Sequence, residues 1–192
     1  MDGKTHISIP DNIMIQNIKL DYDLSVFLSA DYEQHHGSCI SYQKKEQVDL
    51  HEEVGGFPES FTTENTKLQQ LWFGEQDVDY NDLGNQLNME VVTVSSILQP
   101  PGNTVTLHRD TFFKIKQKYP NDTRLKVRAN IYLENWKPGH LVHYQDHNKE
   151  WQCSDHWSAG DGFLWDNSHL HLSGNCGLQN KYTLQISGFY KD

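Results

Sequence analysis

The sequence contains no unbroken apolar run approaching the roughly 18 residues of a membrane-spanning helix. Its first residues, Met1 to His6, carry no apolar core of the kind found in secretory signal peptides. There are only three cysteines, at Cys39, Cys153 and Cys176, and their spacing follows no pattern. An odd, unpatterned set indicates reduced thiols rather than a disulfide framework. We therefore expect a cytoplasmic protein with no membrane partner.

Positive charge is also scarce. The chain has 16 lysines and arginines against 26 aspartates and glutamates, which gives a net charge of -10. Tight binding to a nucleic-acid backbone needs a basic surface, so this balance argues against a nucleic-acid partner. There is also no internal repeat, low-complexity tract or linker that would split the 192 residues. We expect one domain over residues 1–192, with 1–90 as an N-terminal support containing helices and 91–192 as the barrel core carrying the site.

The second half of the chain is rich in short strand-like segments separated by glycine and proline. They cover residues 91–98, 104–107, 124–133, 140–144, 163–166 and 181–189. This spacing is typical of a sandwich or barrel, and it predicts a mainly β jelly-roll with flanking helices. In the first half, Thr62 as an N-cap followed by Leu68, Leu71 and Trp72 at helical spacing predicts a helix up to Phe73.

The most informative stretch follows the predicted strand at 91–98 and the proline- and glycine-rich turn at 99–103. There the chain reads Leu107-His108-Arg109-Asp110. Side chains alternate between the two faces of a strand, so His108 and Asp110 are expected on the same side. An imidazole and a carboxylate on one face supply half of a metal site. Two later histidines, His169 and His171, are both candidates for the remaining ligand.

Two histidines and one carboxylate on one side of a metal leave its other coordination positions open. This facial arrangement is typical of non-haem Fe(II) oxygenases, because the iron must hold a chelating cosubstrate and dioxygen together. An isolated His-x-Asp is common in chains of this size. The pattern therefore indicates a metal site only together with the later histidine and the strand context.

The order of motifs from about Val91 to Phe189 resembles the Fe(II)/2-oxoglutarate-dependent dioxygenases. His-x-Asp is followed by a strand with Tyr132-Leu133, then by a histidine with a basic residue, Lys181, ten positions after His171. The Tyr132 strand and Lys181-Tyr182 are similar to prolyl hydroxylases, whereas Asp166 to Asn175 is similar to the aspartyl/asparaginyl β-hydroxylases. Both resemblances favour His171 over His169 as the third ligand.

The resemblance implies a double-stranded β-helix, or cupin-like, barrel with Fe(II) held by His108, Asp110 and His171. It implies 2-oxoglutarate and dioxygen as cosubstrates, with ascorbate as a candidate reductant. The distal carboxylate of 2-oxoglutarate would be bound by Lys181 with Thr183, where most of the family has Arg-x-Ser. Lysine gives a less directional contact than arginine, so Arg128 is an alternative or additional partner of that carboxylate.

The resemblance also implies the substrate class. The prolyl hydroxylases and the aspartyl/asparaginyl β-hydroxylases both act on amino-acid side chains. We therefore expect hydroxylation of an aliphatic carbon in a protein, a peptide or a free amino acid. Two alternatives remain open: a jelly-roll metal-binding module without turnover, and an oxygenase acting on a nucleobase or nucleotide. Asn130, in the same strand as Arg128, either lines the pocket or makes only local hydrogen bonds.

Overall fold

The computed structural model describes residues 15–32 and 68–191. Thirteen helices and strands are found there. The strands are β1 (Gln16–Lys19), β2 (Gln69–Phe73), β3 (Met89–Gln99), β4 (Thr104–His108), β5 (Lys126–Tyr132), β6 (His140–Gln145), β7 (Trp151–Ser154), β8 (Asp161–Trp165), β9 (His171–Asn175) and β10 (Lys181–Tyr190). The helices are α1 (Ser25–Leu28), α3 (Tyr80–Gln86) and α4 (Phe113–Lys118). None of the described helices is long and apolar enough to cross a membrane.

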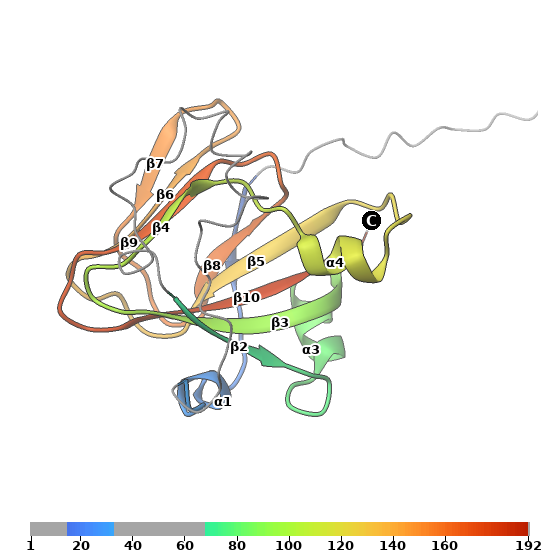
Figure 1. Ribbon diagram of the computed structural model, residues 1–192, viewed down its shortest axis with the longest axis horizontal. Helices are drawn as coiled ribbons and strands as arrows, with labels where there is room; N and C mark the ends of the chain where they lie inside the picture. Colours follow the sequence, from blue (N-terminus) through green and yellow to red (C-terminus); the bar gives the residue numbers. More distant parts are fainter. Residues whose placement is uncertain (1–14, 33–67, 192) are drawn as a thin grey trace, which may run out of the picture.

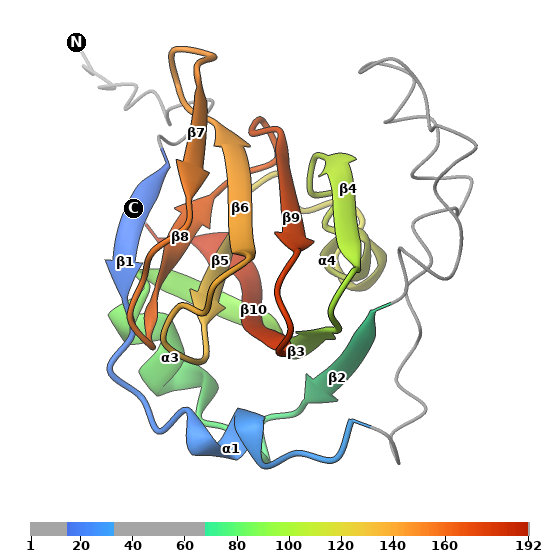
Figure 2. The same cartoon turned by 90° about the vertical axis from the view of Figure 1, so that its left-hand side faces the viewer.

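The strands form two antiparallel sheets. The major sheet has six strands in the order β1-β8-β5-β10-β3-β2, and the minor sheet has four in the order β4-β9-β6-β7. From β3 to β10 the chain crosses repeatedly between the two sheets, and Figures 1 and 2 show the minor sheet facing the major one. This arrangement is a double-stranded β-helix, so the predicted jelly-roll fold is confirmed.

The turn between β3 and β4 sends the chain from one sheet to the other. The N–H of Asn103 donates to the Pro100 carbonyl over 3.2 Å, and Gly102 has a φ of +81°. These are the features of a type II turn, in which proline is favoured at the second position and glycine at the third. The composition Pro100-Pro101-Gly102 therefore fixes where the sheet switch occurs and delivers β4 to the minor sheet.

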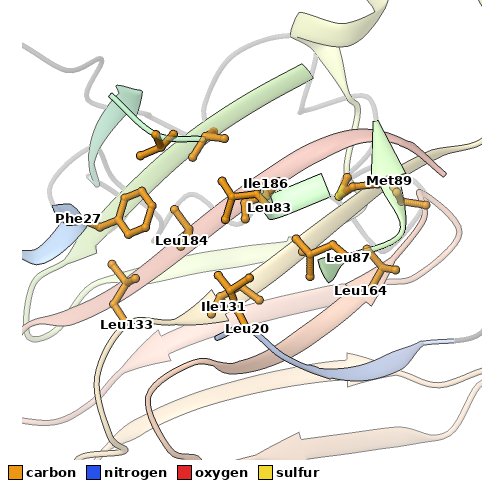
Figure 3. Close-up of a cluster of buried hydrophobic side chains, with 14 residues drawn as sticks. Leu20, Phe27, Leu83, Leu87, Met89, Ile131, Leu133, Leu164, Leu184 and Ile186 are labelled. Atoms are coloured by element: carbon orange, nitrogen blue, oxygen red, sulfur yellow. The ribbon is translucent and has the colours of Figure 1, made fainter. Parts of the chain in front are cut away.

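The main hydrophobic core lies between the major sheet and the N-terminal helices. Leu184 and Ile186 of β10 point into it, as do Ala129 and Ile131 of β5, and all four are fully buried. Figure 3 shows Leu184, Ile186 and Ile131 in one cluster with Phe27 and with Leu83 of α3. Alternation along β10 then turns its other side chains toward the minor sheet.

The predicted helix ending at Phe73 is wrong over its described part. Residues 69–73 form β2, which pairs with β3 from Gln69↔Leu98 to Phe73↔Val94. Leu68 and Leu71 are buried in separate clusters against that strand. Short apolar segments fit helix and strand spacing almost equally well. Here the edge of β3 supplies backbone hydrogen-bond partners along the whole segment, and this pairing selects the strand conformation. Residues 62–67 lie outside the described part of the chain.

The remaining described elements of the first half lie around the major sheet. β1 pairs with β8 and closes one edge of the major sheet, while β2 closes the other. The N-terminal support was expected to contain helices, and α1 and α3 are the helices found in its described part. Helix α3 starts at Asp79, whose carboxylate accepts the backbone N–H groups of Asn81 and Asp82. This N-cap satisfies donors that the first turn leaves free.

Candidate metal centre and its buried lysine

Three side chains converge at one end of the barrel. The candidate ligand atoms of His108, Asp110 and His171 all lie within 4.8 Å of one another. His108 ends β4 and stands directly opposite His171 in the adjacent strand β9. Asp110 lies two residues beyond the end of β4, so it reaches the site from the following loop rather than from the strand face that the sequence suggested. The three residues nevertheless form one compact cluster.

Backbone carbonyls orient both imidazoles. His108 Nδ1 lies 2.8 Å from the Thr106 carbonyl, and His171 Nδ1 lies 3.1 Å from the His169 carbonyl. A carbonyl accepts only, so each Nδ1 carries the proton and each Nε2 keeps its lone pair. Those Nε2 atoms face Asp110, at 4.0 Å for His108 and 3.9 Å for His171. Histidine ligands to metals are commonly fixed in this way by a partner on the other ring nitrogen.

Both oxygens of Asp110 are held by neighbouring side chains. Arg128 pairs with Oδ1 through Nη1, and Trp165 Nε1 donates to Oδ2 over 2.9 Å. Arg128 is itself held by Ser187, whose hydroxyl accepts from Nε at 2.9 Å. The Trp165 ring also lies beside His171, with ring centres 4.5 Å apart. The carboxylate is thus fixed in one orientation by three strands of the major sheet.

The electrostatics keep all three groups in the protonation states that a metal requires. Burial lowers the pKa of His108 to about 3, with a further contribution from nearby His171. Burial also lowers the pKa of His171. For Asp110, burial acts to raise the pKa, but Arg128 and the two histidines outweigh it and the pKa is lowered. At neutral pH the cluster therefore offers two neutral imidazoles and one carboxylate, which suits a divalent metal ion.

His169, the rival third ligand, is not part of this cluster. Its Nδ1 lies 3.2 Å from the Gln145 carbonyl, and its Nε2 is 4.0 Å from Asp166. Asp166 is fully buried and also accepts the backbone N–H and the hydroxyl of Ser168. His169 thus belongs to the loop that leads into β9, and the structure brings only His171 next to His108 and Asp110.

Lys181, the predicted cosubstrate anchor, is 1% exposed. Its Nζ donates to the Leu141 carbonyl at 2.8 Å and to the Ser173 hydroxyl at 2.5 Å. Burial alone lowers its pKa to about 7, and no carboxylate in the described residues forms an ion pair with it. An ammonium group buried without a counter-ion is costly, so this position suits a protein that binds an anion there.

The lysine and the metal cluster are linked through β9. His171 and Ser173 are two positions apart on that strand, which places them on the same face roughly 6–7 Å apart. His171 joins the metal cluster, and Ser173 contacts Lys181. A cavity is lined by His108 and His171 of the cluster and by Ser173, and from the major sheet by Asn130, Thr183 and Gln185 among others. Thr183, proposed beside Lys181, therefore lines the same space.

Arg128 is not placed to share the anchor role expected from the sequence. It pairs across β10 with Ser187, six positions after Lys181, which separates the two backbone positions by roughly 20 Å along the strand. The two cations are too far apart to bind one carboxylate together. Arg128 instead contacts Asp110, which makes it a positioning residue of the metal cluster.

Two participating residues were missed from the sequence. Trp165 was not predicted to take part in the site, but it donates to Asp110. Ser173 was not singled out, although it supports Lys181. The strand period could have revealed Ser173, because it follows His171 by two positions. No comparable sequence signal links Trp165 to Asp110, which is 55 positions away.

Comparison with solved structures identifies proteins that share this fold. A prolyl-4-hydroxylase from Pseudomonas putida superposes with a TM-score of 0.53 at 16% identity, covering 93% of each chain. The chain shares the fold of this enzyme. Two α-ketoglutarate-dependent enzymes of nogalamycin biosynthesis agree with this. The epimerase SnoN gives a TM-score of 0.57 at 7% identity, over 92% of this chain and 77% of its own.

The second nogalamycin enzyme, the carbocyclase SnoK, gives a TM-score of 0.55 at 10% identity, over 92% of this chain and 79% of its own. No protein-family model matches the sequence, and no curated protein matches it. At these identities the likeness establishes the fold, and the activity has to be argued from the site.

Proposed function

We propose that the protein is an Fe(II)- and 2-oxoglutarate-dependent dioxygenase that hydroxylates an aliphatic carbon of an amino-acid side chain. The observation that carries this proposal is the presence of two features beside one cavity. The cavity is lined by His108 and His171 of the facial donor set that also includes Asp110. It is also lined by Ser173, which accepts a hydrogen bond from Lys181, a buried lysine without a counter-ion among the described residues. Neither feature alone would distinguish a metal-binding module from an enzyme.

The donor set fits iron by its chemistry. Two imidazoles and one carboxylate are the ligands of non-haem Fe(II) oxygenases, and they leave adjacent positions for other ligands. His108 and His171 would bind through Nε2, since each Nδ1 is engaged by a backbone carbonyl. When bound, Fe(II) supplies the oxygen chemistry that converts 2-oxoglutarate to succinate and CO₂ and oxidises a C–H bond of the substrate.

The chain's own residues would position the cosubstrate and keep water away. Lys181 would hold the distal carboxylate, with Ser173 and Thr183 as neutral hydroxyl partners. 2-Oxoglutarate is a five-carbon diacid with a carboxylate at each end. His171 and Ser173 are two positions apart on β9, roughly 6–7 Å, which suits a ligand of this length that contacts a metal at one end and Lys181 at the other. Aromatic rings line part of the space, including Phe163 and Trp165 with ring centres 5.8 Å apart, and they would limit the access of water to a bound cosubstrate.

The substrate class is supported by two lines of argument. The P. putida structure with the same fold is a prolyl-4-hydroxylase, and the Tyr132-Leu133 and Lys181-Tyr182 motifs resemble that branch. The nogalamycin epimerase and carbocyclase show that this fold also accommodates other chemistry. We therefore propose a protein, peptide or free amino-acid substrate on the strength of the motifs. We also propose a cytoplasmic location, in which the free and exposed Cys153 and Cys176 would stay reduced.

The test is a substrate screen with the purified Fe(II) protein. Peptides containing proline, aspartate and asparagine, the free amino acids, and a set of nucleosides and nucleotides are incubated with 2-oxoglutarate and oxygen. We expect succinate release coupled to the gain of one oxygen atom in an amino-acid product, by mass spectrometry. The His171→Ala variant should be inactive and the exposed His147→Ala variant should be active. Turnover of nucleosides alone would contradict the substrate class, and metal binding without any succinate would contradict the enzyme assignment.

A further inference from the structure

Asn130 has a buried donor with no partner. It lies on β5 with 9% of its surface exposed, and its Nδ2 is a buried side-chain atom without a hydrogen bond among the described residues. Buried polar groups in folded proteins are nearly always satisfied, because leaving a donor unpaired costs free energy. An unpaired amide inside a binding cavity therefore indicates an absent ligand.

The orientation of the Asn130 amide is set by its neighbour across the sheet. Gln185, which is its register partner on β10, donates from Nε2 to Asn130 Oδ1 over 3.1 Å. With its oxygen engaged, the amide presents its NH₂ group as the free end. That group can only donate, so its partner must be an acceptor such as a carboxylate or carbonyl oxygen.

The position of Asn130 decides which acceptor is within reach. Asn130 lines the cavity together with His108, His171 and Trp165. It is one strand repeat from Arg128, the residue that holds Asp110. Its partner Gln185 is four positions from Lys181 on β10, roughly 13 Å along the strand. Asn130 therefore belongs to the metal end of the cavity and not to the lysine end.

We infer that Asn130 is a positioning residue for the cosubstrate, donating from Nδ2 to an oxygen of its 2-oxo-acid head group, the end that would face the metal. This inference rests on the proposed function and extends it to a residue outside the metal ligands and the lysine anchor. It divides cosubstrate recognition between two polar residues. Asn130 recognises the head group that all 2-oxo acids share, and Lys181 recognises the distal carboxylate.

Two probes separate these roles. Pyruvate has the 2-oxo-acid head group and lacks the distal carboxylate, whereas 2-oxoglutarate has both. Binding of each acid to the Mn(II)-loaded protein is measured by calorimetry without oxygen, so that no turnover is needed. The variants are Asn130→Leu, Asn130→Asp and Lys181→Met, with the exposed Asn81→Leu as a matched asparagine control. Metal content and urea unfolding of each variant establish that it is folded and loaded.

Asn130→Leu is expected to weaken both acids by a similar factor, roughly 10-fold to 100-fold for the loss of one hydrogen bond to a charged group. Asn130→Asp is expected to weaken both further, because it sets a carboxylate against an anionic head group. Lys181→Met is expected to weaken 2-oxoglutarate alone, and Asn81→Leu neither acid.

Unchanged affinity for both acids in Asn130→Leu would overturn the inference, and so would a loss confined to 2-oxoglutarate. Retained binding in Asn130→Asp would also overturn it, because the ligand would then have to donate to residue 130. Wild-type protein that takes up Mn(II) but binds neither acid would overturn the proposed function together with this inference. Failure of the inference alone is recognised by normal 2-oxo-acid binding in the wild type.

Discussion

The two faces of the major sheet use the same strands for opposite purposes. On β10, Leu184 and Ile186 point away from the minor sheet into an apolar core and are fully buried. Lys181, Thr183 and Gln185 point toward the minor sheet, where they are polar and mostly hydrogen-bonded. The apolar face stabilises the fold, and the polar face presents the side chains that we propose bind the cosubstrate. A strand with strict alternation can keep the two purposes independent, because neighbouring residues do not share an environment.

The strongest test of the polar face is removal of a candidate metal ligand. His171→Ala should abolish stoichiometric metal binding, since it leaves one imidazole and one carboxylate, while the apolar core is untouched. Metal content after loading with Fe(II) or Mn(II) is the measurement. His169→Ala serves as the comparison and should keep its metal. The opposite result, loss in His169→Ala and retention in His171→Ala, would show that the site uses the other histidine.

Lys181→Met should produce the next largest effect. It leaves the distal carboxylate of 2-oxoglutarate buried without a cation, a loss on the order of 3–5 kcal/mol in cosubstrate affinity. The apparent Michaelis constant for 2-oxoglutarate should rise accordingly, and metal affinity should stay unchanged. The free energy of unfolding of the ligand-free protein should not fall, because the variant removes a buried charge without a counter-ion. An unchanged Michaelis constant would exclude the anchor role.

A pair of adjacent residues tests the apolar face directly. Leu184→Ala creates a cavity in the main core and should lower the free energy of unfolding by roughly 2–5 kcal/mol, with cosubstrate affinity retained in the folded protein. Thr183→Val, one position away on the opposite face, should change stability little and weaken 2-oxoglutarate. Urea unfolding gives the free energy of unfolding of each variant, and titration gives the affinity of each variant for 2-oxoglutarate. If both substitutions change both properties to the same extent, the two faces are not independent.

Arg128→Gln should have a smaller effect on the metal. It removes the cation that holds Asp110, and loss of such a supporting partner typically lowers metal affinity about 10-fold to 100-fold. The pKa of Asp110 should rise, so metal should be released at a higher pH during acidification. Arg124→Gln is the control, because its ion pairs with Asp122 and Glu90 lie at the surface. Equal metal affinity in the two variants would show that Arg128 does not support metal binding.

The pH dependence of cosubstrate binding should be the mildest effect. Burial lowers the pKa of Lys181 from its ordinary value to about 7, so the ammonium is present below pH 7 and is lost as pH rises through it. Affinity for 2-oxoglutarate should fall above pH 7, by up to about tenfold per pH unit. Ligand-free stability should move the other way, since the unfolded chain binds more protons between pH 7 and the ordinary lysine pKa.

Lys181→Arg checks that assignment. Arginine stays charged throughout this range, so the variant should bind 2-oxoglutarate with an affinity that no longer changes above pH 7. Titrations at several pH values, with wild type and variant side by side, supply the comparison. A slope that persists in Lys181→Arg would assign the pH dependence to a group other than Lys181.

The sequence predicted much of the fold because its signals were local. The Pro100-Pro101-Gly102 turn and the alternating strands of the second half do not depend on distant partners. The strand β2 was mistaken for a helix because its pairing partner β3 decides its conformation. The family resemblance selected His108, Asp110 and His171, and the structure brings those three together.

The supporting contacts of the site were harder to predict. Asp110 was expected in a strand and lies in a loop, where Arg128 and Trp165 hold it. Those contacts join residues from β5 and β8 to a loop after β4, and no spacing rule in the sequence links them. The contact between Arg128 and Asp110 could not be predicted for the same reason, because an arginine in a strand can pair with any anion that the tertiary structure brings near it.

The direct pairing of His108 with His171 has a consequence for how the protein acquires its metal. These two residues are 63 positions apart in the chain, and they become neighbours only when β4 pairs with β9. Pairings between distant segments form late and slowly, because closing a long loop costs entropy before any contact compensates for it. The metal site therefore does not exist in partly folded chains that lack this pairing. Metal uptake during refolding should follow completion of the minor sheet, and metal added at that stage should protect the barrel from reopening.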